Sequence, residues 1–152
     1  MRLKIIKNTE SGRSMLEIIG VLAIMTLMSA GAFIMIRSSM ATQRRNTVVD
    51  DFSKIVTGVR TLYSDYDDLT VFDGEGAMAA MGIDKNKTPY NNATYSVTRV
   101  GNGKDGRFDV KISGLPNKDC IVLARRSWPD SIGKSSSCPK SGSQYVSVTY
   151  RK

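Results

Sequence analysis

An uncharged stretch near the amino terminus constrains this chain more than any other feature. Residues 18–36 contain neither a charged residue nor a proline. As a helix this stretch rises about 28 Å, close to the ~30 Å hydrocarbon core of a bilayer. We therefore expect a membrane-spanning helix, with the basic segment 1–12 on the cytoplasmic side and everything after Ile36 outside.

Two simpler interpretations of this stretch remain open. A Sec signal peptide would be removed entirely, although its apolar core is normally only about 7–15 residues long. A plain single-pass anchor would stay in the membrane. Neither explains Glu17, a carboxylate beside the apolar run that costs about 2–3 kcal/mol if it enters the bilayer.

The composition excludes several classes of catalytic site. The 152 residues include no histidine and two cysteines, with a net charge of +8. The absence of histidine removes Ser-His-Asp and Cys-His catalysis and HExxH zinc sites, and two cysteines alone cannot form a structural zinc site. We expect a protein that is not an enzyme and has no cofactor or metal centre.

The run GRSMLEIIGVLAIM resembles the class III signal of type IV prepilins. Gly12 precedes Arg13, Glu17 is the fifth residue counted from Arg13, and an apolar helix follows. The resemblance implies cleavage by a prepilin peptidase between Gly12 and Arg13, then N-methylation of Arg13, where family members usually carry Phe or Met. It also implies polymerisation, in which Glu17 pairs with the free amine of a neighbouring subunit.

The remaining chain predicts an α+β head packed on the second half of a long helix. Apolar residues recur at helical spacing up to Tyr63, so we expect one helix from about residue 14 to 64 that is amphipathic after Arg37. Further helices are expected near 77–81 and 116–126, and strands at 94–100, 108–112 and 144–150. The segment GNGKDG predicts the turn of a hairpin.

The two cysteines, Cys120 and Cys138, lie outside the membrane in this topology, so we expect a disulfide, with a pair of free thiols as the alternative. The bridge would close 19 residues and contribute about 3 kcal/mol. We expect the residues between the cysteines to form a surface loop held only by this bridge.

A second resemblance covers the carboxy-terminal part. The run GRFDVKISGLPNKDCIVLA resembles the segment before the first cysteine of type IVb pilins, and the helix start resembles that class more closely. The implied organisation is a cleaved leader at 1–12, a transmembrane and filament-core helix at 13–37, its amphipathic continuation at 38–64, and an α+β head of pilin-like fold at 65–152.

Two other groups of charged residues are candidate sites. An acidic cluster could hold calcium, but its spacing does not fit an EF-hand loop and a solvated helix end is the favoured interpretation. Two Arg-Arg pairs could contact nucleic-acid phosphates or lipid head groups, but solvated surface or ion pairs between subunits are favoured. The cluster is Asp65, Asp67, Asp68, Asp73 and Glu75, and the pairs are Arg44–Arg45 and Arg125–Arg126.

The expected function is therefore a structural pilin subunit that sits in the bacterial inner membrane before assembly and in an extracellular or periplasmic filament afterwards. Its expected partners are further copies of itself, a prepilin peptidase, an inner-membrane assembly platform and membrane lipid. The alternatives are a minor pilin, a type II secretion pseudopilin, or a membrane-tethered binding domain that does not polymerise.

Overall fold

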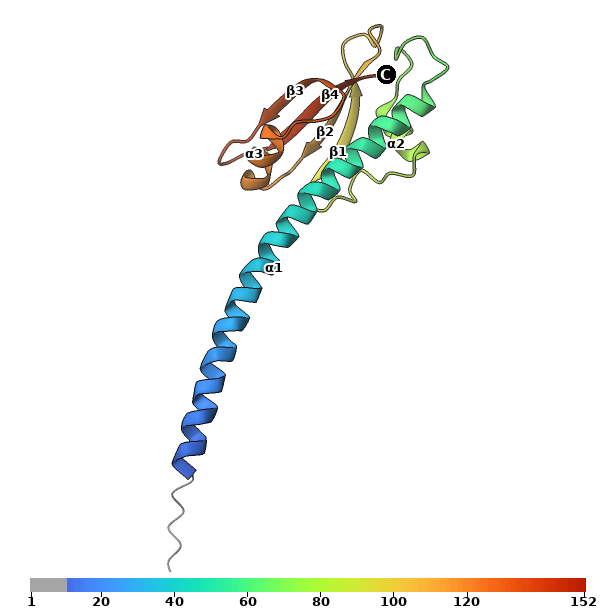
Figure 1. The fold of residues 1–152 in the computed structure, drawn as a ribbon. Helices are drawn as coiled ribbons and strands as arrows, with labels where there is room; N and C mark the ends of the chain where they lie inside the picture. Colours follow the sequence, from blue (N-terminus) through green and yellow to red (C-terminus); the bar gives the residue numbers. More distant parts are fainter. Residues whose placement is uncertain (1–10) are drawn as a thin grey trace, which may run out of the picture. The chain divides into compact units, whose positions relative to one another are not determined.

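The computed structural model describes residues 11–152, with side chains from Met15 onward (Figure 1). The chain divides into two compact units, 1–42 and 43–152. Helix α1 (Ser11–Leu62) begins in the first unit and ends in the second. No proline interrupts it, which agrees with the long helix predicted from the periodicity.

The part of α1 in the second unit is amphipathic. Five of its apolar residues are buried and recur at intervals of three and four, which places them on one face of the helix. They are Val48, Phe52, Ile55, Val56 and Val59. Leu62 continues the same spacing but is 42% exposed at the end of the helix, while Tyr63 packs against Phe72.

Four antiparallel strands form one sheet in the order β1-β2-β4-β3. The strands are β1 (Thr94–Arg99), β2 (Arg107–Ser113), β3 (Ser131–Ser137) and β4 (Tyr145–Arg151). In the central pairing, Val110 of β2 lies between Val97 of β1 and Val148 of β4. The α+β class and an antiparallel sheet at the helix are therefore confirmed.

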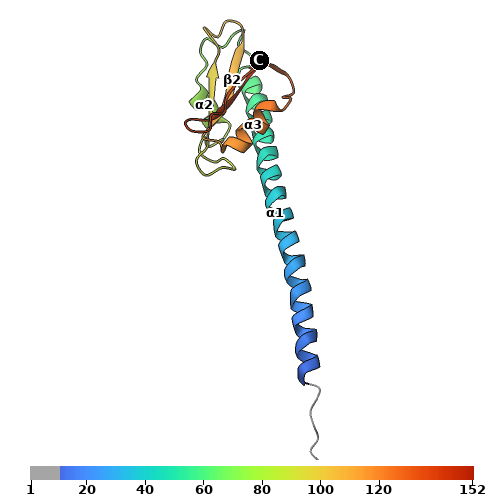
Figure 2. The ribbon, with the colours of Figure 1, turned by 90° about the vertical axis from the view of Figure 1, so that its left-hand side faces the viewer.

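One face of this sheet supplies about a third of the residues of a common hydrophobic core. Alternate residues of β2 are buried, as expected for a strand with one face covered. The rings of Tyr95 and Phe52 of α1 form a T-shaped pair at a centroid distance of 6.1 Å, so α1 lies against this face (Figure 2). The sheet contributes Tyr95, Val97, Phe108, Val110, Ile112, Val146, Val148 and Tyr150 to the core.

Two short helices complete the second unit. In α2 (Gly74–Ala80), the Asp73 carboxylate accepts hydrogen bonds from the backbone N–H groups of Glu75 and Gly76 at 3.1 and 3.0 Å. This N-cap starts the helix a few residues before the predicted 77–81. The other helix, α3 (Asn117–Arg125), follows Pro116 as predicted and buries Cys120 and Leu123.

The prediction for the segment between the cysteines is wrong. It is not a surface loop held only by a bridge, because β3 pairs with β4 along its length and Trp128 is only 6% exposed. The indole ring packs on Phe52 at a centroid distance of 4.7 Å, and its Nε1 donates to the Leu123 carbonyl oxygen at 3.2 Å. A strand with three consecutive serines gave no alternating apolar pattern from which it could be predicted.

The β1–β2 hairpin contains a glycine that the fold requires. Gly103 has φ +78°, and a Cβ there would lie 2.4 Å from the backbone oxygen of Leu69, a fully buried residue. The N–H of Leu69 in turn donates to the Gly103 oxygen at 2.9 Å. Gly101 has φ +59°, but a Cβ there would have no neighbour within 4 Å, so this glycine provides a matched control.

We predict that Gly103→Ala destabilises the second unit more than Gly101→Ala does. Both substitutions carry the left-handed backbone cost of about 1 kcal/mol, and only Gly103→Ala adds a backbone clash of about 1–3 kcal/mol. Urea unfolding followed by fluorescence of the single tryptophan, Trp128, measures both free energies of unfolding. Equal losses in the two variants would contradict a structural role for the Gly103–Leu69 contact.

Candidate functional site

The apolar half of α1 presents its side chains outward in the structure. Every residue from Met15 to Met40 is exposed, and the large apolar ones range up to 76% at Leu27. This helix is long and apolar enough to cross a membrane. It is also unlike the buried core helix of a globular protein, since nothing in the described chain covers it.

Hydroxyl groups within this apolar stretch bond to the helix itself. Thr26 Oγ1 donates to the Ala23 carbonyl oxygen at 2.8 Å, and Ser29 Oγ donates to that of Met25 at 2.7 Å. Polar groups satisfied inside one helix can enter hydrocarbon without losing a hydrogen bond. The stretch is therefore compatible with lipid despite these residues.

The acidic residue predicted to guide assembly lies at the start of the described side chains. Glu17 is exposed, and among residues 15–152 no basic side chain forms an ion pair with it. Gly12 and Arg13, the predicted cleavage and methylation residues, belong to the first turn of α1, but their side chains lie outside the described residues. The structure thus leaves the cleavage and pairing roles as predictions.

Two glycines in the apolar stretch leave open space on the helix. A Cβ at Gly20 or Gly31 would have no neighbour within 4 Å. No packing within the described chain therefore requires a glycine at either position, although each costs about 1 kcal/mol of helix stability relative to alanine. Such positions allow a second helix to approach closely.

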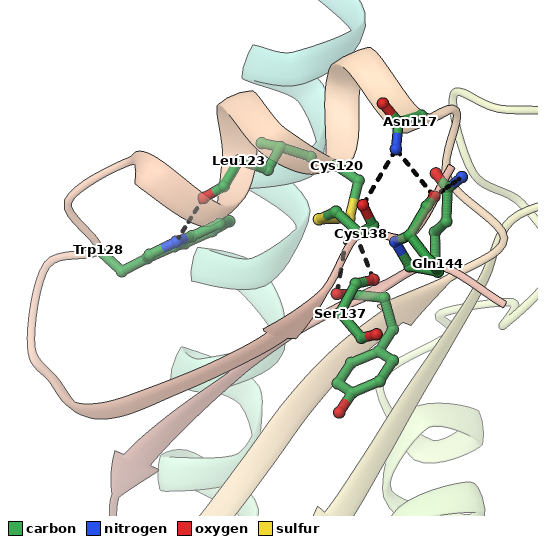
Figure 3. Close-up of a disulfide and its surroundings, with 9 residues drawn as sticks. Asn117, Cys120, Leu123, Trp128, Ser137, Cys138 and Gln144 are labelled. Carbon is green, nitrogen blue, oxygen red and sulfur yellow. Dashed lines mark hydrogen bonds between the residues drawn. A yellow bond between two sulfur atoms is a disulfide. The ribbon is translucent and has the colours of Figure 1, made fainter. Parts of the chain in front are cut away.

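The two predicted disulfide cysteines are brought together in the second unit. Cys120 of α3 and Cys138, directly after β3, are joined by an S–S bond of 1.99 Å with their Cα atoms 5.7 Å apart. Figure 3 shows the bridge beneath α3, with Trp128 at the far end of the same helix. The expected disulfide is confirmed, and the free-thiol alternative is wrong.

A polar side chain on each side of the bridge fixes the chain after Cys138. Asn117 Nδ2 donates to the carbonyl oxygens of Cys138 and Pro139 at 3.1 and 2.9 Å, and Gln144 Nε2 donates to that of Pro139 at 3.0 Å (Figure 3). The Cys138 end of the disulfide-closed segment is therefore held by hydrogen bonds as well as by the covalent link.

An ion pair that sequence reasoning missed joins α1 to α3. Arg45 Nε lies 2.6 Å from Asp119 Oδ1, and both side chains are largely shielded from water. The buried Tyr90 ring lies beside this pair. Its hydroxyl is close enough to the Asp119 carboxylate to be affected by it, but the two do not form a hydrogen bond of normal geometry. Burial first, and then the Asp119 carboxylate, raise the pKa of Tyr90 to about 12.

Three residues of the acidic cluster form contacts with neighbouring groups of the same chain. Asp73 caps α2, and Glu75 pairs with Lys85 at 2.8 Å. The Asp68 carboxylate accepts hydrogen bonds from the hydroxyl and N–H groups of Thr70, which lower its pKa. Among the residues that the structure describes, no three acidic side chains converge as a metal site would require.

The two Arg-Arg pairs differ in how their members are used. Arg45 binds Asp119, and Arg126 Nη1 donates to the Asn46 side-chain oxygen at 3.1 Å. Arg44 and Arg125 are exposed and make no side-chain hydrogen bond or ion pair with the described residues. One arginine of each pair therefore links the α3 region to α1, and the other is exposed to solvent.

We predict that reducing the disulfide lowers stability without detaching β3. Loss of a bridge that closes this length of chain costs about 3 kcal/mol, whereas pairing with β4 and burial of Trp128 persist. Urea unfolding with and without reductant measures the first effect, and hydrogen exchange of residues 131–137 measures the second. Full exchange of these amides in the reduced, folded protein would show that the bridge alone holds the segment.

We predict that Tyr90→Phe weakens the alkaline sensitivity of the fold. The raised pKa means that the unfolded chain ionises this tyrosine first, so stability present below pH 10 is lost as pH rises toward 12. Near pH 7 the variant should be as stable as the wild type or slightly more so, because the removed hydroxyl is unpaired. Unfolding free energies between pH 7 and 11.5 test this, and an unchanged alkaline slope would contradict it.

No family model, curated protein or solved structure matches this chain. The candidate site is therefore the long apolar helix that is exposed from Met15 to Met40. The second unit has a separate core and a Cys120–Cys138 disulfide.

Proposed function

We propose that this chain is a structural, non-catalytic subunit of a type IV pilus-like filament. A peptidase removes residues 1–12 on the cytoplasmic side of the membrane, Arg13 becomes the methylated amino terminus, and the apolar helix then packs against those of other copies. Cleavage, methylation and polymerisation are carried over from the resemblance of residues 12–36 to prepilins.

One observation carries the proposal. The hydrophobic core of the second unit draws only on residues from Val48 onward, so the exposed stretch 15–40 adds nothing to it. An apolar helix of this length in water would be strongly unfavourable, at about 25 cal/mol for each Å² left uncovered. Lipid before assembly and neighbouring helices after assembly would both cover it.

The position of Glu17 suggests how the copies find their register. A carboxylate surrounded by apolar helices requires a cation, because an unpaired buried charge is heavily penalised. The amine created at Arg13 on a neighbouring copy is close to the level of Glu17 when the copies are staggered by about one helical turn. The pair would then act as a register device, as single buried polar residues do in coiled coils.

We predict that Glu17→Gln is processed normally but assembles poorly. The substitution keeps the size of the side chain and leaves the neighbour's amine unpaired, a loss of about 3 kcal/mol per contact, or about 100-fold in association. Fibres sheared from the native host and probed for this chain measure assembly, and the mass of the amino-terminal peptide measures processing. Glu75→Gln, in an exposed surface pair with Lys85, is the matched control.

Normal fibre yield from Glu17→Gln would disprove the pairing. Retention of residues 1–12 in cells with an active peptidase would disprove the processing. The abundance of the chain in sheared fibres also separates the subclasses, since a major pilin forms most of the fibre, whereas a minor pilin is a trace component and a pseudopilin stays with the cell envelope.

A further inference from the structure

The outer face of α3 carries apolar and basic side chains together. Ile121 and Val122 are 37% and 43% exposed, and Lys118 and Arg125 lie one turn before and after them on the same face. Neither Lys118 nor Arg125 makes an ion pair or a side-chain hydrogen bond with the described residues. This face is therefore free to contact something outside the chain.

Other basic residues surround this face, and the acid within α3 is already neutralised. Asp119 binds Arg45, which leaves Arg44, Lys118, Arg125 and Arg126 as what we call the basic surface. The Arg45–Asp119 and Arg126–Asn46 contacts place α3 beside the first turns of α1 in the second unit. The basic surface thus lies where the chain enters this unit.

Chain length keeps the basic surface near the bilayer. Arg44 is eight residues after Ile36, a separation of about 12 Å as helix and at most about 28 Å if fully extended. At any angle between the two units, Arg44 therefore stays close to the membrane surface from which the chain emerges. The head-group layer extends about 5–7 Å beyond the hydrocarbon core, so along the continuous helix α1 the Arg44 charge lies within a Debye length of about 8–10 Å of the head groups.

We propose that α3 docks on anionic phospholipid head groups of this membrane face before assembly, with Ile121 and Val122 inserted between them. The proposal rests on the membrane-anchored stage of the proposed function. An apolar pair flanked by basic residues is the arrangement by which surface helices bind an anionic interface. Each basic residue near such a surface favours the docked state about fivefold.

The full chain in nanodiscs, with one copy per disc, tests the proposal. Discs of phosphatidylcholine are compared with discs containing 30% phosphatidylglycerol, and hydrogen exchange of residues 118–126 is measured at 150 and 500 mM NaCl. We expect exchange to slow at least fivefold in the anionic discs at the lower salt concentration, and this protection to be lost at the higher one.

Charge-reversal variants locate the effect. Lys118→Glu combined with Arg125→Glu should lower the ratio of docked to undocked protein at least 25-fold and abolish the protection. Lys104→Glu combined with Arg151→Glu changes the net charge equally at exposed positions beside the β1–β2 hairpin and should retain it. Urea unfolding followed by Trp128 fluorescence verifies that both variants are folded.

The outcomes separate this proposal from the proposed function. Equal exchange in both kinds of disc, with the chain inserted, overturns the docking and leaves the filament role standing. Protection that appears only with two copies per disc identifies a second copy as the occupant and also overturns it. Failure of the chain to enter discs overturns the membrane-anchored stage and the docking together.

Discussion

The apolar half of α1 demands a covering that the chain does not provide. Residues 15–40 are exposed throughout, and the hydroxyls of Thr26 and Ser29 are already bonded to the helix backbone. Hydrocarbon or other helices can therefore cover the stretch favourably, whereas its exposure to water is unfavourable. Glu17 is the exception, and its charge limits which helical arrangements are acceptable.

The second unit depends on a different constraint, the burial of Phe52. This ring meets Tyr95 of the sheet on one side and Trp128 of the disulfide-closed segment on the other. Phe52 therefore links α1, β1 and the segment after α3 within the hydrophobic core. Because the core begins at Val48, the unit has its own source of stability, which does not depend on what covers the apolar stretch.

The sequence predicted the elements whose signals are local. Helical spacing predicted α1, glycine-rich turns predicted the β1–β2 hairpin, and Pro116 predicted the start of α3. It could not predict β3, because backbone pairing with β4 creates that strand and its serines contribute no alternation. The Arg45–Asp119 pair joins residues 74 apart in sequence, and no local pattern could have predicted it. The proposed pairing of Glu17 with the amine of Arg13 involves two copies, so it is likewise not a property of one chain's local sequence.

The pairing of β3 with β4 restricts how this chain can diversify. Side chains alternate between the faces of a strand, so one residue inserted into β3 would turn its outward serines inward and misplace Cys138 relative to Cys120. The exposed turn at residues 139–143 lies outside both the disulfide bridge and the β3–β4 pairing. Related sequences can therefore differ in the length of that turn, and the outward residues of β3 can be substituted one for one. Insertions within β3 are disfavoured, because the strand is fixed both by the disulfide and by its hydrogen bonds to β4.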